Sequence, residues 1–195
     1  MKSNFFLRIS SALKALFLTF CIGVWSSSYA MEYSSIDATK SKITFTSKLM
    51  GSKISGGFGK FSGKISFNPD EPEKAKANLL IDVASFNAGG EELQDEAKGK
   101  DWFNTKLFPV ANFVSDSVKV TGPNSIEIHG LLTLKGKSAP IVVTAKYQAQ
   151  GKQMMFDANF QLLRLDYGLG TGSWADTSAV ANEVPVRVNL VLNQK

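Results

Sequence analysis

The sequence IEIHGLLTLKGKSAPIVVTAKY, residues 126–147, consists of two halves with the same alternating pattern. Its first half places apolar or small residues at every second position from Ile126 to Leu134, and its second half does the same from Ile141 to Tyr147. Alternation with a period of two is typical of a half-buried antiparallel strand. Gly136 lies between the two halves, at the distance of a hairpin turn. The stretch therefore predicts a β-hairpin with one apolar face.

The same alternation extends along the chain in both directions. It predicts eight strands, at about residues 42–48, 64–68, 77–84, 112–120, 126–134, 141–147, 154–162 and 184–192. A break in phase around Ser115 to Ser117 interrupts the fourth of them. Residues 68–72, 121–124 and 150–152 carry the Pro, Gly and Asn residues typical of turns. Eight strands at this spacing indicate an antiparallel sandwich or barrel.

One segment departs from the strand pattern. Residues 90–100 are charged, rich in helix-forming residues and poor in β-branched ones. We expect one short helix there, ending near Gly99. The helix would bring Trp102 and Phe103 to one end of the barrel, either as a lid over the interior or as a plug of that end.

The first thirty residues resemble a secretory leader. Lys2, Arg8 and Lys14 precede an uncharged, largely apolar run, and Ser28-Tyr29-Ala30 ends the segment with small residues at the positions that a signal peptidase reads. The run is shorter than the ~20 residues that span a bilayer, so cleavage after Ala30 is expected rather than a retained anchor. Residues 31–195 then form a single domain.

Composition restricts the chemistry. The chain has one His, His129, and one Cys, Cys21, which excludes a zinc site, a Cys–His nucleophile and a disulfide framework. His129 alternates with the inward-facing positions and so points outward, and no Gly-x-Ser-x-Gly motif occurs. Without the leader, 19 basic residues face 17 acidic ones, which does not favour nucleic acid. No catalytic residue, metal or cofactor is expected.

Aromatic residues are frequent on the predicted inner face. The interior of an eight-stranded barrel either fills with side chains or holds one small ligand, and composition alone does not decide between the two. If the interior is hollow, the predicted ligand-binding residues are Phe45, Phe58, Phe61, Phe67, Ile81, Val83, Trp102, Phe103, Phe113, Leu132, Phe156, Phe160 and Trp174. Asp101 and Arg164 are expected to form a structural ion pair with each other or to face a ligand head group.

Several blocks resemble the YceI-like family, in the same order along the chain. They are ISGGFGKFSGKISF at 54–67, KDWFN at 100–104 with Phe108-Pro109 and NFVS at 112–115, HGLLTLKG at 129–136, LRLDYGLG at 163–170 and NEV at 182–184. The resemblance implies a lipocalin-like antiparallel barrel in the periplasm that binds a long amphiphile, such as a polyisoprenoid, an isoprenoid quinone or a fatty amide, without catalysis. Residues 47–50 and 93–97 lack the His that many members carry there, so the resemblance does not identify the ligand or the residues at the polar end of the cavity.

Three functions are compatible with these features. The first is a periplasmic carrier of such a lipid, the second an accessory protein that presents a bound quinone to a membrane redox partner, and the third a small outer-membrane barrel. A membrane barrel would place Lys64, Asp82 and Glu127 in lipid, which favours the carrier. Its expected partners are the lipid, a transient contact with the membrane or a membrane redox protein, and a second copy in a homodimer.

Overall fold

The structure is a computed structural model that describes residues 31–195, so the predicted leader at 1–30 lies outside the described residues. Within 31–195 there are eleven strands and one α-helix. The strands are β1 Tyr33–Ile36, β2 Lys42–Leu49, β3 Ser52–Phe58, β4 Phe61–Ser66, β5 Lys76–Asp82, β6 Phe86–Asn87, β7 Val110–Gly122, β8 Ser125–Leu134, β9 Lys137–Gln150, β10 Gln153–Leu163 and β11 Glu183–Gln194. The helix α1 is Glu91–Lys98, and four 3₁₀ turns are η1 Pro72–Lys74, η2 Val83–Ser85, η3 Arg164–Tyr167 and η4 Gly172–Trp174.

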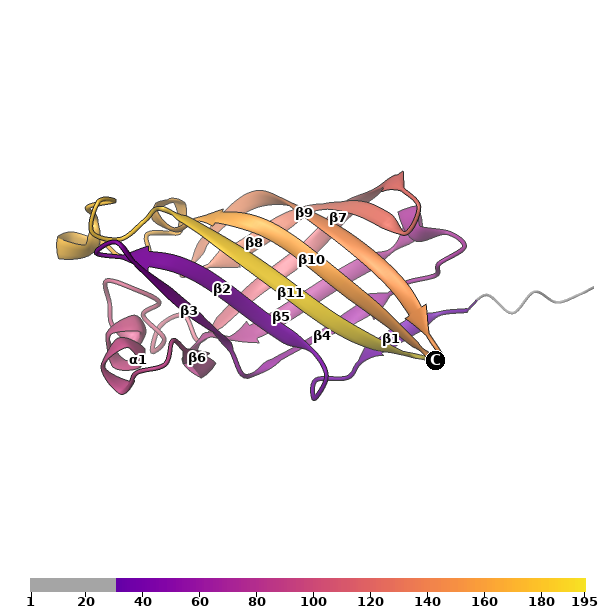
Figure 1. The fold of residues 1–195 in the computed structure, drawn as a ribbon, viewed down its shortest axis with the longest axis horizontal. Helices are drawn as coiled ribbons and strands as arrows, with labels where there is room; N and C mark the ends of the chain where they lie inside the picture. Colours follow the sequence, from indigo (N-terminus) through magenta and orange to yellow (C-terminus); the bar gives the residue numbers. More distant parts are fainter. Residues whose placement is uncertain (1–30) are drawn as a thin grey trace, which may run out of the picture.

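All strand pairs are antiparallel, and they form one curled sheet (Figure 1). The strand order is β4-β5-β7-β8-β9-β10-β11-β2-β3-β6, and β1 pairs with β11 outside this path. Tyr33 of β1 also exchanges two backbone hydrogen bonds with Phe67, of 2.8 and 3.1 Å. Strand β1 therefore joins β11 to the segment that follows β4, which draws the two sides of the sheet together at the end where the chain terminates.

The hairpin at 126–147 has the predicted alternation. Val143, Ala145 and Tyr147 are buried, whereas Val142, Thr144 and Lys146 between them are exposed. Lys135 and Gly136 both have positive φ, as a two-residue hairpin turn with the favoured twist requires. The expected break at Ser115 to Ser117 is a shift of register between β7 and β8. Such an irregularity increases the local twist and helps the sheet to curl.

The predicted number of strands was wrong. The short β1, the glycine-containing β3 and the two-residue β6 were missed, because none of them carries a long apolar alternation. Strand β3 needs its glycines for close packing. A Cβ at Gly56 would lie 2.4 Å from the carbonyl oxygen of Asn87 and 2.6 Å from the Phe45 ring. The predicted helix is confirmed as α1, and Gly99 follows its last residue.

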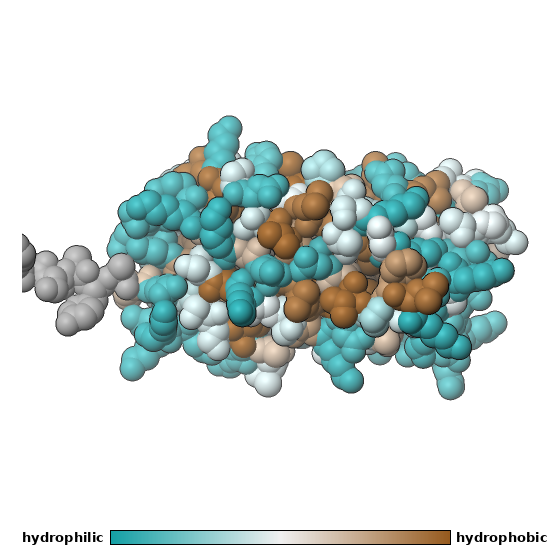
Figure 2. Space-filling view, turned by 180° about the vertical axis from the view of Figure 1, so that it is seen from behind, coloured by the Kyte–Doolittle hydropathy of each residue, from teal (hydrophilic) through white to brown (hydrophobic). Residues whose placement is uncertain are grey.

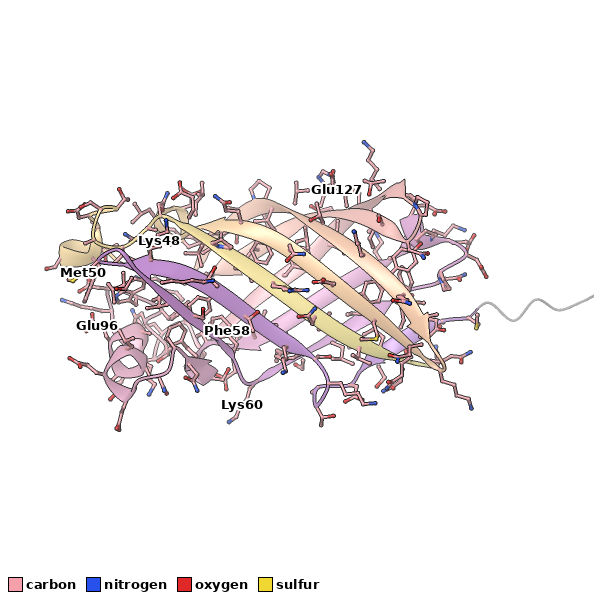
Figure 3. All side chains as sticks on the ribbon, viewed as in Figure 1. Lys48, Met50, Phe58, Lys60, Glu96 and Glu127 are labelled. Atoms are coloured by element: carbon pink, nitrogen blue, oxygen red, sulfur yellow. The ribbon has the colours of Figure 1, made fainter. Side chains whose placement is uncertain are left out.

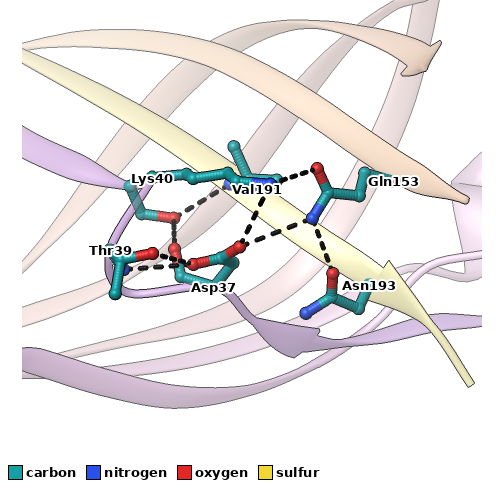
Figure 4. Close-up of polar contacts among 7 residues, drawn as sticks. Asp37, Thr39, Lys40, Gln153, Val191 and Asn193 are labelled. Atoms are coloured by element: carbon teal, nitrogen blue, oxygen red, sulfur yellow. Dashed lines mark hydrogen bonds and ion pairs between the residues drawn. The ribbon is translucent and has the colours of Figure 1, made fainter. Parts of the chain in front are cut away.

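A polar cluster fastens the β1–β2 turn to β11 (Figure 4). The Ser41 hydroxyl donates to the Asp37 carbonyl at 2.7 Å and accepts from the Val191 amide at 2.9 Å. Asp37 Oδ1 accepts from the Thr39 hydroxyl at 2.6 Å, and this bond lowers the pKa of the Asp37 carboxyl. Gln153 donates to Asp37 Oδ2 at 3.4 Å. The cluster therefore ties the turn to β10 and β11 at the end opposite α1.

Apolar side chains also gather on part of the outer surface (Figure 2). Leu80, Val114, Leu131 and Val142 lie on β5, β7, β8 and β9, which are neighbours in the sheet, and each is about two-fifths exposed or more. Val114 and Leu131 are directly opposite each other across β7 and β8. An exposed group of this kind on adjacent strands is typical of a contact surface.

Candidate ligand-binding site

The curled sheet encloses an apolar cavity of about 270 Å³. Its lining comes from α1, from every strand of residues 31–195 except β1, and from the segments after β4, β6, α1 and β10. Among the described residues, the polar side chains in the lining are Ser47, Lys76, Glu96, Ser115 and Arg164. For comparison, an engineered apolar cavity of about 150 Å³ in another protein stays dry and binds benzene. This cavity has room for a considerably larger apolar group.

Most of the predicted ligand-binding residues line this cavity. They are Phe45, Phe58, Phe67, Ile81, Trp102, Phe103, Phe113, Leu132, Phe156, Phe160 and Trp174. Phe61 and Val83 do not line it in the described part of the chain. Phe61 is the first residue of the edge strand β4 and packs half-buried against the core. Val83 is buried, but Asp82 accepts a hydrogen bond from the Ala84 amide at 2.9 Å and ends the strand, so that Val83 begins a 3₁₀ turn.

Two groups of aromatic rings lie at opposite ends of the cavity. Near α1, the rings of Phe45, Phe58, Phe86 and Phe103 contact one another with centroids 5.3–6.3 Å apart. At the other end, the rings of Phe67, Tyr147 and Phe156 are 4.8–6.0 Å apart. Stacked, tilted and edge-to-face rings at these distances form large, rigid apolar walls. Phe86 lies in the two-residue strand β6, which has no alternation, so the sequence did not identify it.

Helix α1, which carries Glu96 (Figure 3), and the 3₁₀ turn η4 both contribute side chains to one end of the cavity lining. Glu96 of α1 accepts a hydrogen bond from the Trp174 indole at 2.8 Å. The Trp174 ring packs on Trp102 with centroids 6.0 Å apart, and the Phe103 amide donates to the Ala97 carbonyl of α1 at 2.9 Å. Helix α1 and the two tryptophans therefore lie over this end and contribute side chains to the lining. Leu93 and Ala97 lie one helical turn apart, and this spacing is the sequence signal that α1 faces the cavity.

Arg164 is buried beside this end of the cavity and is only 1% exposed. All five of its N–H groups donate to backbone carbonyls, at 2.8–3.1 Å. The acceptors are the carbonyls of Leu169, Gly170, Trp174, Val180 and Ala181. Its guanidinium also lies 5.7 Å from the centroid of the Trp102 ring. Burial lowers the pKa of Arg164 below its usual value, because desolvation disfavours the charged form.

The expected ion pair between Asp101 and Arg164 was wrong. Among residues 31–195, no carboxylate lies within salt-bridge distance of Arg164. Asp101 instead accepts from the Thr171 hydroxyl at 3.1 Å through Oδ1, and its carbonyl accepts from the Gly170 and Thr171 amides at 2.7 and 3.0 Å. Within residues 31–195, Asp101 is not among the residues that line the cavity. The loop after β10 is therefore held by Arg164 on one side and by Asp101 on the other.

Within residues 31–195, no three His, Cys, Asp or Glu side chains come together as a metal site. His129 bonds to Glu127 at 2.7 Å and is not in the cavity lining. In the same part of the chain, no helix is long and apolar enough to cross a membrane.

A family model for the YceI-like domain matches residues 35–192, which is most of the chain. The chain belongs to this family. The resemblance of the sequence blocks is therefore confirmed, as is the lipocalin-like antiparallel fold, which has eleven strands in residues 31–195 instead of eight.

Solved structures and curated relatives agree with this assignment. BcnA of Burkholderia cenocepacia is 38% identical, with a TM-score of 0.78 over 80% of this chain and 99% of that one. A polyisoprenoid binding domain from Saccharophagus degradans, implicated in plant cell wall breakdown, shares the fold at 22% identity, with a TM-score of 0.68 over 85% of this chain and 99% of that domain. A UPF0312 protein of Ectopseudomonas mendocina is 36% identical over 97 residues, so the match spans about half of each chain.

Proposed function

We propose that this YceI-like chain is a periplasmic carrier that holds the apolar part of one long lipid, such as a polyisoprenoid, in its cavity without catalysis. The observation that carries the proposal is the continuous apolar lining contributed by ten strands of residues 31–195. The Saccharophagus degradans domain, which has the same fold and binds polyisoprenoid, supports the choice of lipid. The leader-like residues 1–30 support the periplasmic location.

Burial of hydrocarbon is sufficient to drive such binding. Each buried methylene contributes about 0.8 kcal/mol, so a dozen carbons would contribute roughly 10 kcal/mol before the costs of ordering and association. Few polar contacts are then needed. The lining is consistent with this, because Arg164 already uses all of its donors on backbone carbonyls and, among the described residues, neither His nor Cys lines the cavity.

A cavity-filling series at Ala145 tests the proposal. Ala145 of β9 is 4% exposed and lines the cavity, whereas its neighbour Thr144 points outward. Replacement of Ala145 by Leu and then Phe should weaken the binding of geranylgeraniol in that order, measured by displacement of a fluorescent fatty acid. If the Phe ring excludes about four methylenes, about 3 kcal/mol is lost, or roughly a hundredfold in affinity.

Thr144→Phe is the matched control, since it adds the same ring on the outer face. Its affinity should stay within about twofold of the unchanged protein. Circular dichroism and thermal unfolding would show that each variant is folded. Equal affinity of folded Ala145→Phe and Thr144→Phe variants would contradict binding inside the sheet.

The other expected partners stay predictions. In a homodimer, two copies could contact each other through the exposed apolar side chains of Leu80, Val114, Leu131 and Val142 (Figure 2). Light scattering at several concentrations tests that state. A quinone-presenting role requires a redox-active extract from the purified protein, which an absorbance spectrum would reveal.

A further inference from the structure

The tip of the β2–β3 hairpin lies at the end of the molecule that carries α1, where Figure 3 labels Met50 and Glu96. The turn at the tip consists of Met50 and Gly51, whose φ angles are 49° and 79°. Met50 is 75% exposed, and no other large apolar side chain of residues 31–195 is more exposed. Asn, Asp and Gly are favoured in such a turn, because they tolerate positive φ. A methionine at this position therefore does not stabilise the fold, either by its backbone conformation or by burial.

Two lysines flank this turn. Lys48 and Lys53 are directly opposite each other across β2 and β3, and both are exposed. Among residues 31–195, neither has a carboxylate within salt-bridge distance. Like charges in directly opposite positions destabilise a strand pair, since their Cβ atoms are only about 4.5–5.5 Å apart. The tip therefore combines an exposed apolar side chain with two adjacent positive charges, and neither feature is explained by the stability of the hairpin.

The tip is continuous with the cavity. Leu49 before the turn and Ile54 after it are half-buried and belong to the cavity lining. The Met50 amide donates to the Ala179 carbonyl at 2.7 Å, so the backbone of the tip is held by the loop after β10 while the Met50 side chain stays exposed. A surface that contacts Met50 would therefore lie next to this end of the cavity.

The small size of the tip favours a lipid surface over a protein partner. A stable protein interface buries about 800 Å² on each partner, far more than a two-residue turn offers. Docking on a bilayer needs less, because an apolar side chain can enter the head-group region while neighbouring lysines are attracted by the negative surface potential of anionic lipids. An anionic bilayer is therefore the partner whose chemistry matches the tip.

Carboxylates near the tip do not reverse its charge. The part of the loop after β10 that holds the tip, residues 171–181, carries one carboxylate, Asp176, which accepts from the Ser178 amide and hydroxyl at 2.8 and 2.7 Å. Helix α1 carries the other nearby acidic cluster, and it lies below the tip in Figure 1. Within that helix, Asp95 already pairs with Lys98 at 2.9 Å.

We propose that the β2–β3 tip is a membrane-docking element, which places the Met50 side chain among the head groups of an anionic bilayer. Lys48 and Lys53 attract the tip to that surface. Docking brings the end of the cavity lined by Leu49 and Ile54 against the membrane, where the lipid enters or leaves. The inference rests on the proposed function, since it assigns the place at which the carrier exchanges its lipid.

The test measures sedimentation of the purified protein with vesicles of phosphatidylglycerol and phosphatidylcholine in equal parts, and with vesicles of phosphatidylcholine alone. Met50→Asn suits the turn but removes the apolar side chain, and it should weaken binding to the mixed vesicles about tenfold. Lys48→Gln combined with Lys53→Gln should weaken it about 25-fold, at about fivefold for each lysine. The unchanged protein should bind phosphatidylcholine alone at least tenfold more weakly, and added salt should weaken its binding to the mixed vesicles.

Matched controls make the same changes away from the tip. Met155→Asn replaces a methionine of β10 that is 42% exposed, and Lys42→Gln combined with Lys152→Gln removes two exposed lysines that lie outside the tip. Both controls should bind the mixed vesicles within about twofold of the unchanged protein. The tip variants should unfold at the same temperature as the unchanged protein or higher, because Asn fits the turn and the lysine pair is repulsive. Loss of vesicle binding in a variant of unchanged stability cannot come from misfolding.

Uptake of geranylgeraniol separates this inference from the carrier function. Met50→Asn should bind geranylgeraniol as the unchanged protein does when no vesicles are present, but should take it up from mixed vesicles about tenfold more slowly. If the tip variants match the unchanged protein in vesicle binding and uptake, the docking inference is overturned and the carrier stands. Equal binding to both kinds of vesicle, or binding to neither, would also overturn the inference. If the tip variants lose vesicle binding but no protein binds geranylgeraniol, docking is supported and the carrier function fails.

Discussion

The structure makes Arg164 the residue whose loss should be most damaging to stability. Arg164→Met keeps a long unbranched side chain but leaves five buried or partly buried carbonyls without a donor. A hydrogen bond to a charged group contributes about 1.5–3 kcal/mol, so five of them set an upper limit near 7–15 kcal/mol. Water that enters the loop after β10 will replace part of this. We therefore expect a loss of about 3–5 kcal/mol, a large share of the stability of a typical domain.

Urea unfolding followed by circular dichroism measures this loss. Arg164→Lys has three donors instead of five and should lie between Arg164→Met and the unchanged protein. Arg187→Met is the control, since Arg187 is an exposed arginine of β11 whose partner Asp157 lies on the surface, and its effect should be much smaller. A loss below about 1 kcal/mol for Arg164→Met would show that the five carbonyls do not depend on this side chain.

Three further substitutions have defined outcomes. Gly130→Ala should destabilise the protein by about 1–3 kcal/mol in thermal unfolding, because its Cβ would lie 2.4 Å from a β7 carbonyl oxygen. Gly122→Ala is the control and should be nearly neutral, since a Cβ there would have no atom within 4 Å. Equal effects of the two substitutions would contradict close packing at Gly130. Ser41→Ala removes the acceptor for a buried β11 amide and should lower the free energy of unfolding by about 1–3 kcal/mol. Hydrogen exchange of that amide should become faster. Unchanged exchange would contradict a role of Ser41 in fastening the β1–β2 turn to β11. Arg187→Gln should raise the pKa of Asp157, which the Arg187 hydrogen bond now lowers. The variant should therefore be less stable than the unchanged protein at neutral pH, and this difference should vanish as the pH falls below about 4. An NMR titration of the Asp157 carboxyl that shows the same pKa in both proteins would exclude this coupling.

The strands with long alternation could be predicted from the sequence because the period of two is set by local geometry. The hairpin at 126–147, the break of phase in β7 and helix α1 are examples. Strands β3 and β6 pair because Gly56 allows a close approach, and that is a property of two segments brought together by the fold. The position of Val83 also could not be predicted from the alternation, since the Asp82 side chain ends the strand one residue before the apolar pattern ends.

The candidate site could be predicted in its apolar part and not in its polar part. Inward-facing aromatics follow from strand periodicity, which explains why most of the predicted residues line the cavity. The volume of the cavity depends on how side chains pack, so composition left the choice between a hollow and a filled interior open. The partners of Arg164 are backbone carbonyls, which every residue possesses, so the sequence pointed instead to the acidic side chain of Asp101.

The presence of a lipid in the cavity is tested most directly by native mass spectrometry of the protein purified without detergent, followed by solvent extraction and mass measurement of what is released. We expect one long, largely apolar molecule for each chain, lost on denaturation and restored when geranylgeraniol is added. A native mass equal to that of the polypeptide in repeated preparations, together with no uptake of geranylgeraniol, would contradict it.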